Sequence, residues 1–497
     1  MIPYLLVLLS GASLTFAFAP FSAWPVTFLA VAVAVRQLLR TPGKGFLCGW
    51  LFGLGWFGAG ISWVHVSIAD FGGLPLIASV GAMALLCAYL SIYPALAFYF
   101  TKRFFPSRLW PLAMPFFWML LEWVRSWMLS GFPWLSLGYS QIDSPLNGWL
   151  PVIGETGVTA LVILLASAVA VLPLFQRWPA LVAIYFIAFS SGWAVNQYNW
   201  VVRDKQYQVA MVQGNIQQSL RWVPEHDEPT MQKYQNLTAP LWDADLILWP
   251  EAAVPKLENL ATPFLTDLNE QAVEHNTALI TGIVNFNWES SEAWNNLIVL
   301  GKKHRSDEFG DYSYFHNNRY SKHHLLPIGE FVPFEDLLRP LAPLFDLPMS
   351  SFSRGGYQQT NLIANGIYLA PAICFEIAFP HQVAANLHEN TDMILTVSND
   401  AWFGHSHGPA QHLEIARMRA KEFGRPVLRA TNNGITAFID FRGNITSRLP
   451  QFEAGSLRSP VITTRGFTPY RYWGDYAVVM LTSMLALIAL YLKRRAS

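Results

Sequence analysis

The sequence predicts a polytopic α-helical membrane domain joined to a layered α/β domain. Hydrophobic residues make up 53% of the chain and charged residues only 13%, whereas a soluble protein carries roughly 25% charged residues. Residues 1–200 contain eight Lys or Arg and four Asp or Glu, so most of the charges lie after residue 200. The later part instead contains short apolar runs rich in β-type residues. We therefore expect a membrane domain at 1–200, a polar domain at 205–470 and a last membrane helix at 475–492.

Eight apolar segments are long enough to cross a membrane, which takes about 20 mostly apolar residues. The first resembles a signal peptide, with the small residues Ala17 and Ala19 near its end. It lacks a positively charged start and further apolar segments follow at once, so we expect it to be retained. The segments lie at about 3–19, 24–40, 46–67, 74–101, 109–129, 150–174, 178–197 and 475–492.

The basic residues between these segments predict the orientation, because Lys and Arg concentrate in cytoplasmic loops. With a cytoplasmic N-terminus, every basic loop falls on the cytoplasmic side. Seven segments then place residues 205–470 on the opposite side, and the eighth returns the C-terminus. The loop residues are Arg36, Arg40, Lys44, Lys102, Arg103, Arg108, Arg177, Lys493, Arg494 and Arg495.

The polar domain contains seven short apolar runs that we expect to form strands. A helical pattern, 409–423, lies between the last two. Strands mixed with helices are typical of a layered α/β domain. The expected strands are 207–212, 246–249, 278–284, 296–300, 368–373, 393–397 and 435–440.

Composition narrows the possible functions. The formal net charge is zero, which argues against nucleic acid as a partner. No G-x-x-x-x-G-K-[ST] motif occurs, so nucleotide-driven transport has no support. Cys48 and Cys87 lie in apolar runs and are expected to be packing residues. Cys374 is alone in the polar domain, which rules out a disulfide framework there and leaves either a buried inert thiol or a reactive one.

Three segments of the polar domain carry candidate catalytic groups. Glu251 follows the apolar run 246–249. Lys322 and Glu330 bracket a loop that contains Pro and Gly, and Cys374 ends the run 368–373. Read singly, these residues fit a surface glutamate, a solvated loop and a buried cysteine.

Together the three segments supply the groups for nucleophilic catalysis by a cysteine. A thiol with a reference pKa of about 8.5 is mostly protonated at neutral pH, and Glu251 can take its proton if burial raises the pKa of the carboxyl group. Attack on a carbonyl builds an oxyanion that the charge of Lys322 can stabilise. Glu330 can orient Lys322 or the base. No histidine is required, unlike in papain-like enzymes.

The motifs W-P-E at 249–251, K-x-x-L-x-P-x-G-E at 322–330 and C-F-E at 374–376 resemble, in this order, the signature of the nitrilase (carbon–nitrogen hydrolase) superfamily. The segment S-N-D-A-W-F-G at 398–404 also resembles it. With membrane segments on both sides, the resemblance narrows to the apolipoprotein N-acyltransferase family and covers essentially the whole chain. Further matching segments are 69–73, 131–135, 211–214 and 347–354.

This resemblance implies an αββα sandwich for residues 205–470, with a catalytic site and several supporting residues. It implies Glu251 as general base, Lys322 as oxyanion stabiliser and Cys374 as nucleophile. Many relatives have Tyr where this chain has Phe375. The implied supporting residues are Glu330, the Phe375 amide, Glu376, Asn295 near the site, and Trp222 in a loop over it.

The implied reaction is acyl transfer in two steps, without a cofactor or metal. A fatty acyl chain moves from a membrane phospholipid to Cys374 as a thioester, and then to the α-amino group of the N-terminal diacylglyceryl-cysteine of an apolipoprotein. Lipid substrates place the enzyme at a bilayer, since each buried CH₂ contributes about 0.8 kcal/mol. The implied location is the bacterial inner membrane, with the catalytic domain in the periplasm.

Two other functions compete with this one. A membrane-anchored amidase or nitrilase could hydrolyse a small amide, although eight segments are excessive for an anchor. A transporter would leave the Glu–Lys–Cys set unexplained and often shows repeated halves, which this sequence lacks.

A few polar residues fall outside these functions. His405, His407 and His412 with Asp400 have a spacing that fits no standard metal site. Glu122 and Arg125 lie one turn apart in an apolar segment and are expected to pair. His65 and Glu155 have no assigned role.

Overall fold

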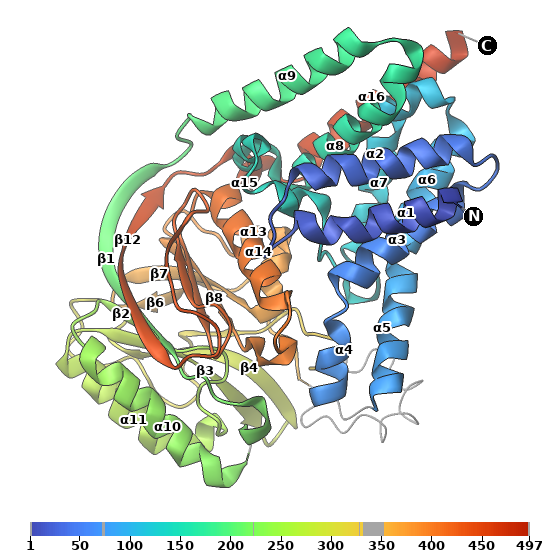
Figure 1. Cartoon of the computed structure of the whole chain (residues 1–497). Helices are drawn as coiled ribbons and strands as arrows, with labels where there is room; N and C mark the ends of the chain where they lie inside the picture. Colours follow the sequence, from blue (N-terminus) through green and yellow to red (C-terminus); the bar gives the residue numbers. More distant parts are fainter. Residues whose placement is uncertain (1, 72–74, 222, 328, 332–351, 496–497) are drawn as a thin grey trace. The chain divides into compact units, whose positions relative to one another are not determined.

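The computed structural model describes residues 2–71, 75–221, 223–327, 329–331 and 352–495. It consists of two compact units (Figure 1). The first comprises Met1–His65, Pro75–Trp200 and Thr468–Ser497, and the second comprises Val66–Leu74 and Val201–Phe467. Residues 66–71, which lie within the apolar part of the sequence, thus belong to the polar unit.

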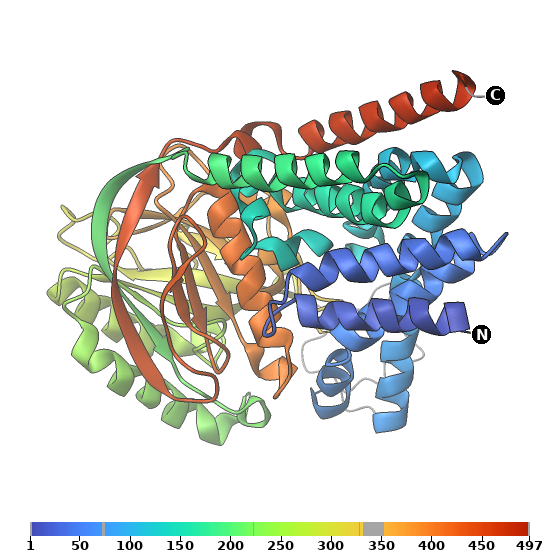
Figure 2. The ribbon, with the colours of Figure 1, turned by 45° about the horizontal axis from the view of Figure 1, so that its top comes forward.

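The first unit is helical, and each of the eight predicted apolar segments contains at least one helix. Proline lies in the first turn of α2, α7, α8 and α9, where its missing N–H has no partner to lose. Figure 2 shows α1 and α2 side by side. The helices are α1 (Ile2–Ser13), α2 (Pro25–Arg40), α3 (Gly45–Gly60), α5 (Leu76–Leu90), α6 (Ile92–Phe104), α7 (Trp110–Arg125), α8 (Leu150–Val171), α9 (Trp178–Asn196), α15 (Pro469–Trp473) and α16 (Tyr476–Arg495).

The number of helices that could span a membrane is smaller than expected. Within the described residues, four are long and apolar enough: Leu76–Phe104, Pro145–Phe175, Trp178–Asn196 and Tyr476–Arg495. A fifth results if α3 and the helical segment Val64–Asp70, bent by 60°, form one span. The apolar helix Ile2–Ala17 is shorter. The prediction of eight spans is therefore not confirmed by helix length, and the predicted helix at 46–67 is broken after Gly60.

Two charged residues inside the first unit, Glu122 and Arg125, are paired. Arg125 forms the expected ion pair with Glu122, and its Nη1 also donates to the carbonyl oxygens of Phe132 and Trp134. These contacts hold the 131–135 loop against α7. Cys48 and Cys87 are buried, in keeping with their expected packing role.

The second unit contains two six-stranded sheets. The first has the order β12-β1-β2-β3-β4-β5. Its central strands β1, β2 and β3 run parallel, and its outer pairs are antiparallel. The strands are β1 (Val202–Gln213), β2 (Leu246–Leu248), β3 (Ala278–Asn287), β4 (Glu292–Gly301), β5 (Arg319–Ser321) and β12 (Gly455–Arg465).

The second sheet has the order β11-β10-β9-β8-β7-β6, with β7, β8 and β9 parallel. The chain therefore repeats the arrangement of the first sheet, with parallel strands at the centre and antiparallel strands outside. The strands are β6 (Leu362–Ala364), β7 (Ile367–Ile373), β8 (Met393–Ser398), β9 (Val427–Thr431), β10 (Ala437–Ile439) and β11 (Ile445–Arg448).

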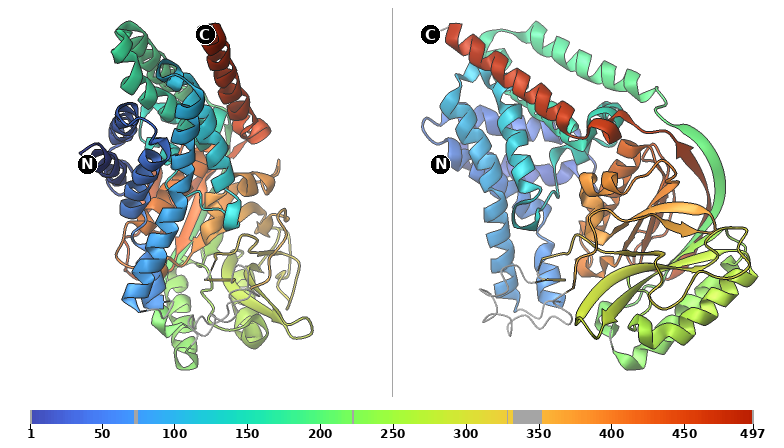
Figure 3. Two further views of the ribbon diagram at one scale, coloured as in Figure 1. Left: turned by 90° about the vertical axis from the view of Figure 1, so that its right-hand side faces the viewer. Right: turned by 180° about the vertical axis from the view of Figure 1, so that it is seen from behind.

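The two sheets pack face to face, and helices cover their outer faces. One buried cluster joins residues of both sheets, such as Met211 and Leu248 of the first with Leu369 and Leu395 of the second. On the outer face of the first sheet lie α10 (Pro224–Thr238) and α11 (Glu258–Glu274), seen together in Figure 3. The second sheet contacts α13 (Pro380–Ala385) and α14 (Gly408–Phe423). The layers are those of the αββα sandwich that the motifs imply.

All seven predicted strands are present, and the helix predicted at 409–423 is α14. Five strands were not predicted: β5, β6, β9, β11 and β12. The edge strand β12 mixes polar and apolar residues without alternation and contains Pro460, and most of its residues are at least partly exposed. The strand pairs with β1 through backbone hydrogen bonds, and its sequence contains no apolar run from which it could be predicted.

Candidate active site

Glu251 lies just beyond the end of β2, inside the first sheet. The apolar run ends because Pro250 has no N–H for the ladder, and the carboxyl side chain that follows is only 8% exposed. The neighbouring strand β3 passes very close at Gly282, where a Cβ would lie 2.2 Å from the amide nitrogen of Ala252. A residue without a side chain is therefore needed there to keep Glu251 in place.

Lys322 follows β5 at the edge of the same sheet. Its backbone N–H donates to the carbonyl of Asn295 at 2.8 Å, and its side chain is 2% exposed. The ammonium Nζ lies 3.3 Å from Oε1 of Glu251 and 2.8 Å from Oε1 of Glu330. The lysine therefore joins the two glutamates of the candidate site.

Asn295 and Glu330 complete this network. The Asn295 amide Nδ2 donates to Glu251 at 2.8 Å and to Glu330 at 3.2 Å. The second oxygen of Glu330 accepts from the backbone N–H of Leu326 at 2.8 Å, and that of Glu251 accepts from the N–H of Asn399 at 3.1 Å. Both carboxylates are thus fixed by polar contacts on more than one side.

Cys374 lies at the turn after β7, on the second sheet. Its φ of +53° places it in the left-handed region, which costs a non-glycine residue about 1–3 kcal/mol. A short 3₁₀ helix, Cys374–Ala378, begins at this residue. The sharp turn leaves the thiol partly exposed at the end of an otherwise buried strand.

Glu376 is fully buried behind this turn and lies outside the set of residues that line the cavity. Its carboxylate accepts from the backbone N–H groups of Ile373, His323 and His324 at 2.7–3.0 Å. Burial raises the pKa of this carboxyl group. The glutamate therefore joins the turn of Cys374 to the segment just after Lys322.

A cavity of about 340 Å³ brings the candidate catalytic residues together. It lies within the second unit, and its lining combines charged, amide and apolar groups from both sheets. The lining residues are Asp70, Gln218, Ser219, Arg221, Glu251, Ala252, Val284, Asn295, Lys322, Leu326, Gly329, Glu330, Phe352, Cys374, Asn399 and Trp402.

Other predicted residues lie elsewhere. The ring of Phe375 packs edge-to-face against Phe379, with ring centroids 5.0 Å apart. Trp222, residues 72–73 of the 69–73 segment and residues 347–351 of the 347–354 segment lie outside the described residues. Asp70 of the 69–73 segment does line the cavity. It belongs to the helical segment Ser67–Phe71, in which Ser67 donates to the carbonyl of Trp402 at 2.6 Å.

Burial and neighbouring charges both act on the pKa values of Cys374 and Lys322. Burial raises the pKa of the Cys374 thiol well above its ordinary value, and the negative charge of Glu251 raises it further, while Lys322 lowers it. For Lys322, burial favours the neutral form, but Glu251 and Glu330 outweigh it, so its pKa lies well above the ordinary value. The resting site therefore holds a neutral thiol beside a permanent cation.

His412 and Asp400, whose spacing with His405 and His407 fits no standard metal site, form a buried hydrogen-bonded pair next to Cys374. Nε2 of His412 lies 3.0 Å from the Cys374 carbonyl oxygen, and its Nδ1 lies 3.2 Å from Asp400. Asp400 also accepts from Arg429 at 2.6 Å. Burial opposes ionisation of Asp400, but Arg429 and His412 outweigh it and bring its pKa to about 2. The ring of His405 instead packs on Phe452.

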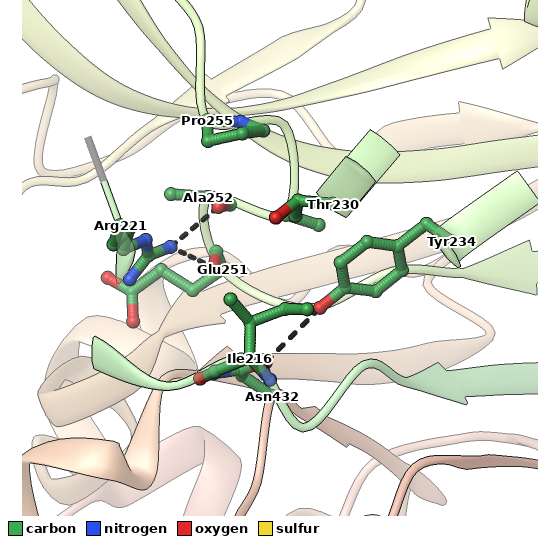
Figure 4. Close-up of a pocket in the computed structure, with 9 residues that line it drawn as sticks. Ile216, Arg221, Thr230, Tyr234, Glu251, Ala252, Pro255 and Asn432 are labelled. Carbon is green, nitrogen blue, oxygen red and sulfur yellow. Dashed lines mark hydrogen bonds between the residues drawn. The ribbon is translucent and has the colours of Figure 1, made fainter. Parts of the chain in front are cut away.

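Arg221 is a second feature that the sequence did not reveal. It directly follows a short 3₁₀ helix (Gln218–Leu220), and its Nη2 donates to the carbonyl oxygens of Glu251 and Ala252 at 2.7 and 2.6 Å. Figure 4 shows the guanidinium beside this backbone. No motif in the sequence marks Arg221, so its place beside Glu251 is a result of the fold.

Comparison with known proteins covers nearly the whole chain. A family model described as carbon-nitrogen hydrolase matches residues 208–465, and one described as apolipoprotein N-acyltransferase N-terminal domain matches residues 10–168. The apolipoprotein N-acyltransferase of Vibrio parahaemolyticus is 46% identical over 491 residues, which cover 98% of this chain and 96% of that one. That of Pseudomonas aeruginosa is 40% identical over 510 residues, covering 98% and 95%.

The αββα sandwich and its matched family model define the second unit as a carbon–nitrogen hydrolase domain. The match of the helical unit, together with relatives that align over almost their full length, narrows this class further. The chain belongs to the apolipoprotein N-acyltransferase family. The resemblance that the motifs indicated is thereby confirmed.

Proposed function

We propose that this enzyme transfers a fatty acyl chain from a membrane phospholipid, through a thioester on Cys374, to the α-amino group of the N-terminal diacylglyceryl-cysteine of apolipoproteins. The observation that carries the proposal is the cavity that Cys374, Lys322 and Glu251 share in a chain of this family. No cofactor or metal enters the scheme, because a thiol, a carboxylate and an ammonium group are sufficient for acyl transfer.

In the first half-reaction, Glu251 takes the proton of the Cys374 thiol as the sulfur attacks the ester carbonyl of the phospholipid. Lys322 stabilises the oxyanion, and its ammonium group has three N–H donors. Two of them are used by Glu251 and Glu330, which leaves one for the reacting oxygen. The bond from the carbonyl carbon to the glycerol oxygen then breaks, and protonated Glu251 returns the proton to that oxygen. The products are the thioester and a lysophospholipid.

In the second half-reaction, the α-amine of the lipoprotein attacks the thioester. Glu251 accepts a proton from the attacking nitrogen, and Lys322 again stabilises the oxyanion. The carbon–sulfur bond breaks, and the proton from Glu251 restores the thiol. An amide and the free enzyme remain. Removing water from the cavity favours this transfer over hydrolysis of the thioester.

Three groups assist this chemistry in our scheme. Asn295 holds Glu251, and Glu330 holds Lys322. Glu376 accepts hydrogen bonds from the N–H groups of Ile373 and His323, and so holds the turn of Cys374 next to the segment that follows Lys322. The backbone N–H of Phe375 is proposed as a further oxyanion donor, since it directly follows the nucleophile.

A labelled-lipid experiment tests the overall reaction. Purified enzyme is incubated with a phospholipid that carries a labelled acyl chain and with a diacylglyceryl-cysteine peptide. We expect the label on the peptide as an amide, and one lysophospholipid per amide formed. A peptide whose α-amine is acetylated serves as control and should receive no label. Release of the label only as free fatty acid would instead indicate a hydrolase.

We further propose that the protein lies in the bacterial inner membrane with its catalytic unit in the periplasm. The position of the basic loops supports this orientation. Reporter fusions after Arg203 and at Ser497 measure it: the first should report a periplasmic position and the second a cytoplasmic one. A cytoplasmic signal after Arg203 would contradict both the orientation and the lipoprotein substrate.

A further inference from the structure

Arg221 holds an unused set of hydrogen-bond donors in the active-site cavity. A guanidinium group has five N–H donors, and Nη2 uses its two on the carbonyl oxygens of Glu251 and Ala252. Within the described part of the chain, the Arg221 side chain has no other hydrogen bond and no ion pair. Its Nε and Nη1 are not among the buried atoms without a partner, and Arg221 lines the cavity, so we take these two nitrogens as the donors that a ligand in the cavity can use.

The other charges of the cavity make this guanidinium distinct. Lys322 is balanced by Glu251 and Glu330, both within ion-pair distance. Asp70 adds a further negative charge to the lining. Of the two cations in the described lining, Arg221 is therefore the one without an ion-pair partner, and it is the better candidate for an anionic ligand.

A hydroxyl group lies on the same turn. Ser219 lines the cavity two residues before Arg221 and belongs to the 3₁₀ helix that the arginine follows. Gln218, which also lines the cavity, is held by Asn399 at 2.5 Å. A guanidinium and a hydroxyl group presented by a fixed turn suit a phosphate, since Arg binds phosphate oxygens through paired N–H donors.

We infer that Arg221, assisted by Ser219, binds the phosphate of the phospholipid acyl donor while the ester carbonyl lies at Cys374. The inference rests on the proposed function and assigns the donor-recognition residue of the same cavity. In a glycerophospholipid the phosphate lies a few bonds from the ester oxygens, so one cavity can hold both groups. Binding through Arg221 selects a phosphate-bearing donor over a neutral glyceride with the same acyl chains.

The test compares two donors that differ only in the phosphate. The rate of thioester formation on Cys374 is measured by mass spectrometry with a phospholipid and with the matching diacylglycerol, both in detergent micelles. The ratio of the two kcat/KM values gives the preference for phosphate. We expect Arg221→Gln to lower this ratio on the order of 10- to 100-fold, the range for a lost charge-assisted hydrogen-bond pair, and Arg221→Lys to keep most of it.

The ratio of the two kcat/KM values distinguishes phosphate binding by Arg221 from a purely structural role of this residue. If Arg221 only supports the Glu251–Ala252 backbone, its substitution slows both donors equally and leaves the ratio unchanged, which overturns the inference. Arg305→Gln is the matched control, because it removes an exposed guanidinium that pairs with Asp245 outside the cavity lining; an equal drop in this control would also contradict the inference.

Two more outcomes are distinguished by the same assay. Inorganic phosphate is added as a competitor, and inhibition that depends on Arg221 without any effect on donor preference would assign the site to free phosphate and overturn the inference. Native enzyme that forms no thioester with either donor would refute the proposed function itself, independently of Arg221.

Discussion

Native enzyme incubated with phospholipid and no lipoprotein should gain the mass of one acyl group on the peptide that contains Cys374. The thiol lines the cavity with Glu251 and Lys322, and without an acceptor amine the reaction stops at the thioester. Hydroxylamine should remove the added mass, because thioesters are labile and amides are not. This adduct is the largest effect we expect, since Cys374→Ala should abolish it.

Matched substitutions make this result specific. Cys374→Ser should fold but be nearly inactive, because a hydroxyl group has a far higher pKa than a thiol and Glu251 cannot readily deprotonate it. Cys48→Ala and Cys87→Ala should keep the adduct, since both side chains are buried in the helical unit. Acyl groups found on Cys48 or Cys87, or full activity in Cys374→Ala, would mean that the nucleophile is wrongly assigned.

Removal of the cation should have the second largest effect. Lys322→Ala is expected to slow thioester formation by about 10²–10³, the usual loss for one oxyanion-stabilising group. Because Lys322 lowers the pKa of the Cys374 thiol and Glu251 raises it, the two substitutions should also shift this pKa in opposite directions. Lys322→Ala raises it further, and Glu251→Gln lowers it.

Alkylation by iodoacetamide as a function of pH measures both shifts, because the thiolate is the reactive form. In native enzyme the rate should still be rising at pH 9. The rise should move to lower pH in Glu251→Gln, although thioester formation is blocked, and to higher pH in Lys322→Ala. Lys302→Ala, at an exposed contact with Asn276, is the control. A normal rate of thioester formation in Glu251→Gln would require another general base.

The sequence was sufficient to predict those parts of the fold that have a local apolar signal. The apolar helices of the first unit and all seven predicted strands are examples, since each depends on a continuous run of residues, whereas the number of membrane spans was not confirmed. Strands β5 (Arg319–Ser321) and β11 (Ile445–Arg448) consist mainly of polar residues and offer no such run. The break after Gly60 was missed because the sequence remains apolar through Trp63, and apolarity does not distinguish a bent helix from a straight one.

The candidate site shows the same limit. Glu251, Lys322, Glu330 and Cys374 are marked by motifs, and the structure brings them to one cavity. The contacts of Arg221 join it to residues 30 and 31 positions later, a separation that no local pattern contains. Asp400 and His412 lie close together in the sequence. The contact between them, and the contact of His412 with the Cys374 carbonyl, exist only in the folded chain.

The neutral state of the Cys374 thiol has a consequence for survival of the enzyme in an oxidising compartment. Disulfide exchange and oxidation to sulfenic acid both proceed through the thiolate, and the raised pKa of Cys374 keeps that form scarce in the resting site. In the periplasmic location proposed above, where free thiols are exposed to oxidants, the resting cysteine would thus stay reduced without a partner cysteine or a dedicated reductant. The same burial and negative charge that make the thiol dependent on Glu251 protect it between turnovers.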